Sequence, residues 1–385
     1  FTIYFAQDDF WLFLVSQANS LSEFFNLFLP SSEVVWYRPL SQQLFFFTGR
    51  ILFGWNPFPF HILVISIHLI TGLWLFRLLK KLNQSQEVAI VATFIYLLNQ
   101  IHTVPLSWLA ANHFVVGPLF VVLSLYFFLK EKPMFSFAST ILGVMTNEVA
   151  LFMPLFLFPL SFYIRSDTRK KSRFFILLPF ILLSFFIVWI RQVAYPTEIN
   201  DTLYRLEVSG SLSALKFYLL RILGVPLFFA NLPFFTKIIT SALFAVWIGG
   251  LLIGLKVFRE IRKQQFSMLI FFTLFLGGLV PFIILPEHLS PYYLSFALVG
   301  AAPLFTKLLN ALKKFGWQSY YLVLGAYLSL QLIGTYSTYQ THWIFKRAQM
   351  AERLIESGDL IHPLGSEEYF SLGGSSAKEL FLGPK

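Results

Sequence analysis

Apolar stretches of membrane-spanning length recur along the chain, and they constrain its fold more than any other feature. Hydrophobic residues make up 57% of the chain and charged residues only 12%, with a mean hydropathy of +0.69. A bilayer core about 30 Å thick requires roughly 20 apolar residues in a helix. This measure predicts ten spans, at 58–79, 87–101, 113–130, 134–146, 149–164, 174–193, 236–255, 266–285, 291–306 and 319–337.

Phe1–Ala6 has the composition of the end of one more span, which we expect to be largely missing from this sequence. The prediction is therefore an all-α polytopic membrane protein with a bundle of about 11 transmembrane helices. Between the spans, residues 12–55 and Leu212–Leu223 mix apolar runs with polar residues, which is typical of amphipathic helices lying in the interface.

The basic residues define an orientation. Five short loops, at 77–81, 130–132, 165–173, 256–263 and 307–314, hold 17 of the 29 Lys and Arg residues, so we expect these loops to be cytoplasmic. The net charge of +10 therefore reflects topology and does not indicate a nucleic-acid partner. Residues 1–337 are expected to form one transmembrane catalytic domain, with outer loops at 7–57 and 194–235. Residues 338–385 would form a short tail on the outer side.

The adjacent acids Asp8 and Asp9 follow directly from an apolar segment. Neighbouring carboxylates repel each other, and an acid near a bilayer is costly unless it has a partner or a task. The pair is therefore a candidate chemical centre. The alternative is a solvated helix cap, because Asp is a good capping residue.

Other polar residues gather at the same predicted face. Arg38 lies in Tyr37-Arg38-Pro39-Leu40, where a guanidinium suits either a phosphate or anionic lipid headgroups. Glu148 is flanked by apolar sequence, which favours a partnered or functional acid. The remaining candidates lie at span ends and are His102, Trp108, Asn112, His113, Asn147, His288, Tyr292 and Tyr293. His61 and His68 are expected to be ordinary buried histidines.

Several motifs are absent from the sequence. It has no Cys, which excludes disulfides and thiolate metal sites. It also has no HExxH, GxSxG or P-loop motif, so a metalloprotease, an α/β-hydrolase or an NTPase has no support.

Taken in order, the acidic pair, YRPL, the span that ends at His102, and the turn Asn147-Glu148 resemble the GT-C superfamily of polytopic glycosyltransferases. The resemblance is strongest to protein O-mannosyltransferase-like members, including the transmembrane-TPR O-mannosyltransferases, and covers residues 5–165. The chain departs from that pattern in three places. The turn lacks a Lys before Glu148, only the second His of a His-Pro-x-His pattern is present at 99–102, and no TPR array follows.

The resemblance implies a hexosyltransferase, such as a mannosyltransferase, that uses a polyprenyl-phosphate-linked sugar and inverts the anomeric carbon. It implies an active site on the outer face, and we expect the plasma (inner) membrane. Asp8 with Asp9, and Glu148, would match catalytic acids, and Arg38 the arginine of YRPL. We add predicted donor-phosphate contacts at His102, His288, Tyr292 and Tyr293, and predicted acceptor or sugar contacts at Trp108, Asn112, His113 and Asn147.

The residues themselves support that chemistry, because a carboxylate can take the acceptor's proton while a cation stabilises the departing phosphate. The mechanism requires no metal. The sequence is also compatible with a divalent ion that bridges Asp8 and Asp9. The acceptor stays open among protein, lipid and glycan, and membrane lipids are expected neighbours. The rival hypothesis is a lipid-linked polysaccharide polymerase, ligase or flippase of the cell envelope.

Overall fold

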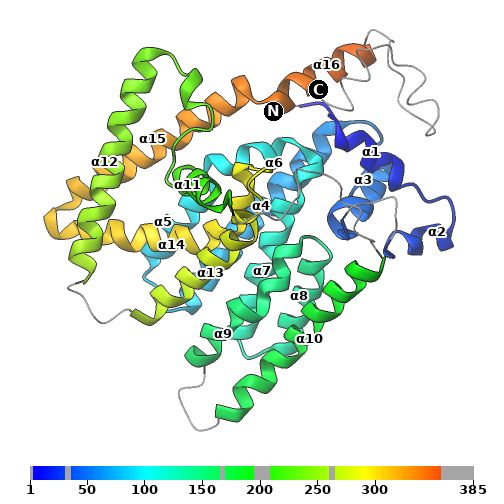
Figure 1. Ribbon diagram of the computed structural model, residues 1–385, viewed down its shortest axis with the longest axis horizontal. Coiled ribbons are helices and arrows are strands. Elements are labelled where there is room, and N and C mark those ends of the chain that lie inside the picture. The colour runs from blue at the N-terminus through cyan, green and yellow to red at the C-terminus, as the bar shows by residue number, and fades with distance from the viewer. Residues whose placement is uncertain (1–2, 31–35, 165–169, 195–208, 260–264, 357–385) are drawn as a thin grey trace.

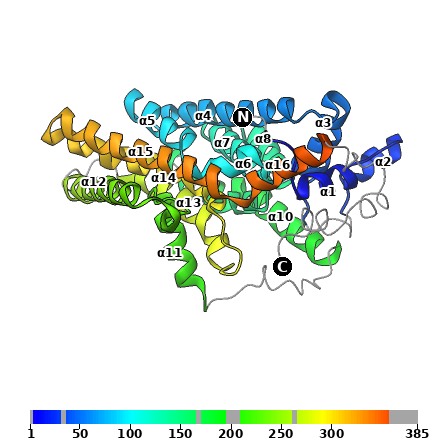
Figure 2. The ribbon, with the colours of Figure 1, turned by 90° about the horizontal axis from the view of Figure 1, so that it is seen from above.

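The computed structural model describes residues 3–30, 36–164, 170–194, 209–259 and 265–356, and all secondary structure in these ranges is helical (Figures 1 and 2). This confirms the all-α prediction. The long helices are α4 (Pro57–Lys81), α5 (Gln86–Leu97), α7 (His113–Leu129), α8 (Pro133–Val144), α9 (Met153–Ile164), α10 (Lys170–Ala194), α12 (Phe234–Arg259), α13 (Gln265–Ile283), α14 (Ser295–Ala311) and α15 (Trp317–Thr341).

Short helices surround the bundle. They are α1 (Asp8–Val15), α2 (Leu21–Asn26), the π-helix η1 (Leu40–Leu44), α3 (Phe45–Phe53), η2 (Gln100–His102), α6 (Thr103–Ser107), η3 (Leu109–Ala111), η4 (Glu148–Phe152), α11 (Ser211–Ile222), η6 (Phe229–Asn231), η8 (Pro291–Leu294), η9 (Leu312–Phe315) and α16 (Trp343–Glu356). Several of them occupy the stretches predicted to be amphipathic.

Each predicted span overlaps a helix, but the count of eleven spans is not confirmed. Within the described ranges, four helices are long and apolar enough to cross a membrane: Pro57–Lys81, Leu109–Leu129, Phe234–Phe258 and Pro291–Phe315. A fifth is added if Gln86–Leu97 and Gln100–Ser107, which meet at a bend of 40°, form one span. The shortfall is partly one of length. α8 has 12 residues, which at 1.5 Å per residue is about 18 Å and shorter than a bilayer core.

α15 has 25 residues and is long enough to span a bilayer, but it is not apolar enough to count among the candidate membrane spans. Gln331, Ser337 and Thr338 are buried along it, so it meets the bundle through polar side chains as well as apolar ones. Some predicted features lie outside the described residues: the first two residues of Phe1–Ala6, the basic residues at 165–169 and 260–264, residues 195–208 of the outer loop 194–235, and the tail after Glu356.

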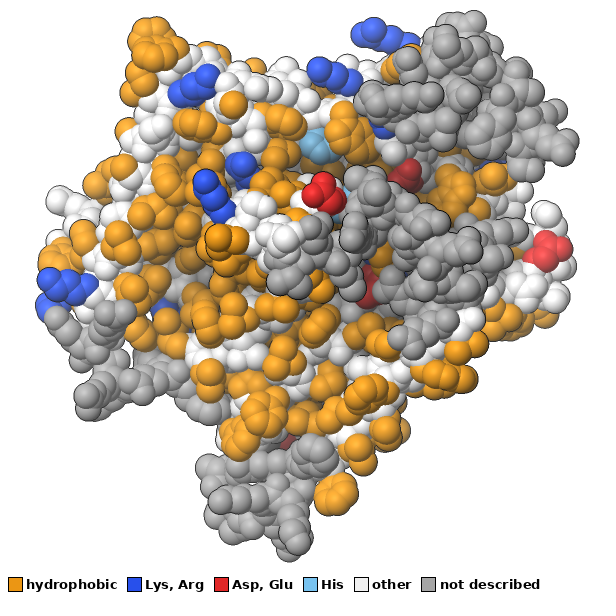
Figure 3. Space-filling model, in the orientation of Figure 1, with side chains coloured by type: hydrophobic (Ala, Val, Ile, Leu, Met, Phe, Trp, Pro, Cys, Tyr) orange, Lys and Arg blue, Asp and Glu red, His pale blue; other side chains and the backbone are white. Residues whose placement is uncertain are grey.

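The centre of the bundle is formed by α4, α5, α7, α13 and α14, with α8 and α9 on one side and α12 and α15 on the other. Many large hydrophobic side chains stay exposed on its outer surface, including Leu69, Phe185 and Leu252. Figure 3 shows hydrophobic side chains spread widely over the described part of one face. A soluble monomer rarely exposes so much apolar surface, whereas a lipid-facing helix does. These helices indicate a membrane-embedded protein.

The two ends of the described chain meet. An aromatic cluster anchors α1, with Phe13 packing edge-to-face at 4.9 Å against both Phe5 and Phe46. α16 then returns to this N-terminal segment, and its Ile344, Phe345 and Ala348 form one buried cluster with Ala6. The predicted tail at 338–385 thus contains a helix, α16, that packs on the N-terminal segment. It closes over the beginning of α1 (Figure 1).

Candidate functional site

The two members of the acidic pair occupy different environments. Asp9 is 1% exposed, and its two carboxylate oxygens accept hydrogen bonds from two backbone amides. Oδ2 accepts from Ala6 N at 2.9 Å, and Oδ1 accepts from Ala110 N at 2.6 Å. Burial raises the pKa of Asp9 well above its usual value, although both hydrogen bonds oppose the shift. Asp9 therefore joins the N-terminal segment to η3.

Asp8 is half-buried and keeps contact with solvent. Burial raises its pKa above the ordinary Asp value, while a hydrogen bond from the Gln7 side chain and the charge of Arg347 lower it. Gln7 itself has a left-handed backbone, with φ of 49°, directly before the pair. A non-glycine residue in that region is strained, and such strain is concentrated at functional sites.

Arg347 is a member of this site that the sequence did not indicate. It lies on α16, where its Nη1 donates a hydrogen bond to Gln7 Oε1 and its guanidinium stacks on the Trp343 ring at 4.6 Å. The spacing of four residues on a helix explains the stacking. Nothing in the sequence indicates the contact with Gln7, because it joins residues 340 positions apart.

Arg38 and Glu148 form a bidentate ion pair. Arg38 Nε lies 3.0 Å from both Glu148 oxygens, and Nη2 lies 2.8 Å from Oε2. The fourth contact joins Arg38 Nη1 to His113 Nε2 at 3.0 Å, while His113 Nδ1 lies 3.0 Å from the Ala110 carbonyl oxygen. A carbonyl only accepts, so Nδ1 carries the proton and Nε2 accepts from Arg38. His113 is thus a neutral imidazole here.

These bonds form one continuous network. It runs from Asp9 through the backbone of Ala110 to His113, Arg38 and Glu148. The network brings together four residues that the sequence suggested separately, and Ala110 links them through its amide and its carbonyl.

The loop that carries Arg38 is fixed by its neighbours. η1 docks on the turn between α8 and η4, because Leu40 N donates to Met145 O at 3.0 Å and Ser41 Oγ to Thr146 O at 2.8 Å. Asn112 Nδ2 donates to Ser41 O at 2.8 Å. π-Helical turns are rare and often mark functional sites. This docking places Arg38 opposite Glu148.

Asn147 and Asn112 support the same region and retain polar atoms for other partners. Asn147 caps η4 by accepting from Val149 N at 2.9 Å. Asn147 Nδ2 and Asn112 Oδ1 are buried and have no hydrogen-bond partner among the described residues. One donor and one acceptor thus stay available beside the ion pair.

An aromatic wall connects the remaining predicted contacts. The Phe114 ring lies 4.2 Å from that of His113 and 5.0 Å from both Tyr292 and Tyr293. Trp108 meets Tyr292 at 6.5 Å and Trp343 at 5.3 Å. The wall therefore reaches from the Arg38 network to α16, so Trp108, His113, Tyr292 and Tyr293 share one neighbourhood.

Two predicted phosphate contacts lie apart from this network. His102 is buried against His68 and Tyr96, with ring centroids 4.5 and 4.9 Å away. Neither ring nitrogen of His102 has a hydrogen-bond partner among the described residues. The His288 ring lies 5.7 Å from the Tyr293 ring of the wall. Phosphate binding by these residues stays a prediction, as it does for Arg38.

An apolar groove of about 420 Å³ begins three residues after Glu148. Its lining consists of Leu151, Phe152, Pro154, Ile181, Ser184, Phe185 and Val188, from η4, α9 and α10. Within the described ranges no three His, Asp or Glu side chains gather as a metal site. A divalent ion bridging the acidic pair would have to share the Asp9 oxygens with two backbone amides.

Comparisons of the chain with protein-family models, with curated proteins and with solved structures find no match. The fold and the site therefore define a class of helical, membrane-embedded protein with a buried polar network. Any narrower function is a proposal.

Proposed function

We propose that this protein is a membrane glycosyltransferase that moves a sugar from a polyprenyl-phosphate-linked donor to an acceptor hydroxyl, with inversion. The observation that carries the proposal is the division of roles within the acidic pair. Asp9 is occupied by two backbone amides, whereas Asp8 is half-buried with a raised pKa. A carboxylate with a raised pKa beside low-dielectric surroundings is suited to general-base catalysis.

The reaction would be a single displacement. The acceptor oxygen forms a bond to the anomeric carbon as the bond from that carbon to the phosphate oxygen breaks. The electron pair leaves on the phosphate, and Asp8 takes the hydroxyl proton. Attack from the face opposite the phosphate inverts the anomeric carbon. If Arg38 is the cation that stabilises the phosphate, the phosphate must displace or share its contacts with Glu148 and His113.

The apolar groove supports a lipid-linked donor. Its volume of about 420 Å³ lies within the ~300–1,000 Å³ range of ligand sites, and its lining suits a prenyl chain. Because the groove begins beside Glu148, a chain lying in it would bring its phosphate end toward the Arg38 network. The distribution of Lys and Arg among the loops supports an outer-face position for this region in the plasma membrane.

The test compares Asp8→Asn with Glu23→Gln, an exposed acid on α2, in purified protein incubated with a panel of polyprenyl-phosphate sugars. Loss of a general base lowers turnover by about 10²–10⁴-fold. We expect that loss in Asp8→Asn with donor affinity kept, and wild-type turnover in Glu23→Gln. Wild-type turnover in Asp8→Asn would contradict the role of Asp8, and consumption of no donor would contradict the reaction.

A lipid-linked polysaccharide polymerase or ligase is the second candidate. It is favoured by Arg221, which lies in the late outer segment and has only backbone carbonyls as hydrogen-bond acceptors among the described residues. Products longer than one added sugar would distinguish a polymerase. Transbilayer movement of an intact donor would distinguish a flippase.

A further inference from the structure

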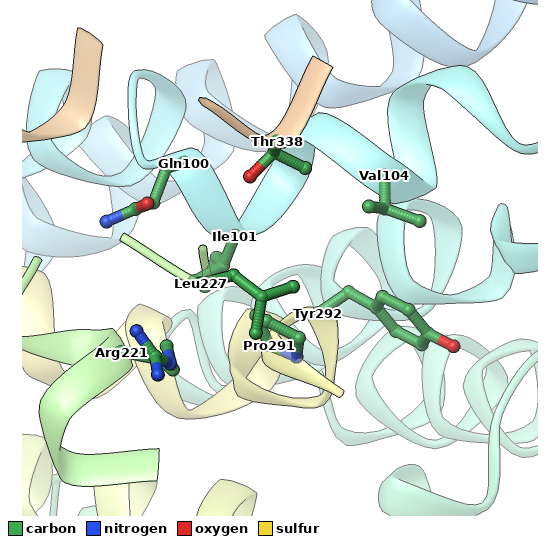
Figure 4. A pocket seen from close by; sticks show the side chains of 8 residues that line it. All are labelled: Gln100, Ile101, Val104, Arg221, Leu227, Pro291, Tyr292 and Thr338. Carbon is green, nitrogen blue, oxygen red and sulfur yellow. The ribbon is translucent and has the colours of Figure 1, made fainter. Parts of the chain in front are cut away.

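A narrow slot lies between α11, the η2–α6 segment, η8 and α15 (Figure 4). Its volume is about 10 Å³, which is room for one water-sized atom. The side chains that line it are Gln100, Ile101, Val104, Arg221, Leu227, Pro291, Tyr292 and Thr338. None of these side chains is acidic, whereas one is a cation.

Arg221 contributes its charge without an acidic partner. Its Nη1 donates to the Val225 carbonyl at 2.9 Å and to the Pro226 carbonyl. Its Nε is buried, and across the described part of the chain neither a hydrogen-bond acceptor for that atom nor a carboxylate within ion-pair range of Arg221 is present. Burial lowers the pKa of Arg221 to about 10, so the guanidinium is still charged at neutral pH.

The turn after α11 holds Arg221 in place. Gly224 has a φ of +96°, and a Cβ there would lie 2.7 Å from Gln331 Nε2. Glycine is therefore favoured by the backbone conformation, whereas a Cβ would only push aside the end of the Gln331 side chain. The turn brings two carbonyls back onto the guanidinium, which fixes its position at the slot.

Gln100 supplies a second donor. Its side chain is 7% exposed, and Nε2 has no hydrogen-bond partner among the described residues. The backbone of Gln100 is held separately, because its N–H donates to Gln331 Oε1 at 3.1 Å. Two of the side chains that line the slot thus carry a buried donor without a hydrogen-bond partner among the described residues, and one of the two is cationic.

Among the described residues, the partners of this partly buried cation are neutral carbonyls and the Phe217 ring, and no counter-charge offsets its lost hydration. A water molecule would satisfy the donors but not the charge, whereas an oxyanion satisfies both. We propose that this slot binds one oxygen of a phosphate group, with Arg221 and Gln100 as the donors. The phosphate is either the headgroup of a lipid phosphate or free phosphate. The slot does not depend on the role of Asp8, and Tyr292 connects it to the aromatic wall.

The test measures binding to the full chain in detergent with three probes: farnesyl phosphate, farnesol and inorganic phosphate. A charge-assisted hydrogen bond corresponds to roughly 10- to 100-fold in affinity. We expect wild-type protein to prefer farnesyl phosphate over farnesol by about that factor. Arg221→Gln should reduce the preference by about 10-fold or more, and Gln100→Leu should reduce it less. Lys216→Gln, which removes an exposed cation from the same helix, should keep it.

Competition by inorganic phosphate at the farnesyl phosphate site would identify free phosphate as a sufficient ligand, and failure to compete would identify the lipid phosphate. If folded Arg221→Gln keeps the wild-type preference, the proposal is wrong. If Arg221→Gln does not fold, an unchanged preference in Gln100→Leu overturns it equally. Asp8→Asn should keep the preference, so failure of the proposed reaction is distinguishable from failure of this site.

Discussion

Arg38 and Arg221 are both partly buried guanidiniums at the rim of one aromatic wall, but they have different partners. Arg38 meets a carboxylate in three contacts and an imidazole in a fourth. Among the described residues, Arg221 donates hydrogen bonds only to backbone carbonyls and lies over the Phe217 ring at 5.0 Å, and its Nε has no hydrogen-bond partner. The first guanidinium is compensated within the chain. The second has no carboxylate partner among the described residues.

The difference suggests how to separate structural from ligand-binding cations in such a bundle. A bidentate pair fixes two segments, here the loop before η1 and the start of η4, and removing one partner leaves the other buried and unpaired. A cation without a counter-charge in the protein can instead gain a favourable charge interaction by binding an anionic ligand. The network from Asp9 to Glu148 should therefore respond to mutation mainly in stability, and the Arg221 slot mainly in binding.

The largest stability effect is expected for Asp9→Ala. It would leave the amides of Ala6 and Ala110 buried without an acceptor, at about 1–3 kcal/mol each. Unfolding in a mild detergent should show a loss of about 2–6 kcal/mol for Asp9→Ala. Asp8→Ala is the matched control, and its free energy of unfolding should stay close to that of wild type. Equal stability of the two variants would show that the network does not begin at Asp9.

This contrast within the acidic pair also shows what could not be predicted from the sequence. Hydropathy predicted the positions of the helices, because apolar length is a local property. It did not predict how many helices are long enough to span, since breaks such as the one between α8 and η4 shorten them. The pair itself was identified, but its members could not be told apart, because the amide that distinguishes them comes from Ala110, 101 positions away.

The pairing of Arg38 with Glu148 was beyond the sequence for the same reason. Each residue was a candidate on local grounds, yet the contact joins positions 110 apart. Arg347 was missed altogether, because an amphipathic helix in a tail gives no indication of what it covers. Residue types and helix periodicity are local signals, whereas the site is made by contacts between distant segments.

A double-mutant cycle on Arg38→Gln and Glu148→Gln tests whether Arg38 is held by a strong ion pair with Glu148. The side chains are 12% and 25% exposed, so we expect a coupling energy of about 1–3 kcal/mol. Lys313 and Glu87, with side chains 21% and 37% exposed, form the control ion pair. This pair is more exposed than the Arg38–Glu148 pair, so we expect its coupling energy to be smaller and closer to the roughly 0–1 kcal/mol of surface pairs. Equal coupling in the two cycles would show that Arg38 is not the more strongly held cation.

The smallest effect is expected at Arg347, which is intermediate between the two arginines. Its guanidinium bonds the neutral amide of Gln7 and acts on Asp8 through its charge. Burial raises the pKa of Asp8 and the charge of Arg347 opposes that rise, with Asp9 as the neighbouring acid. Arg347→Gln should therefore raise the pKa of Asp8 further. A base works deprotonated, so turnover should fall off at a higher pH than in wild type and recover at alkaline pH.

The pH profile of turnover separates this electrostatic role from a merely structural one. Lys346→Gln removes an exposed cation from the adjacent position on α16 and should leave the profile unchanged. Arg347→Lys keeps the charge and should keep the acid limb near its wild-type position. A lower plateau with an unmoved acid limb in Arg347→Gln would mean that Arg347 acts by holding Gln7 in its strained conformation and not by its charge on Asp8. In that case, the C-terminal helix would support the geometry of the pair without tuning its protonation.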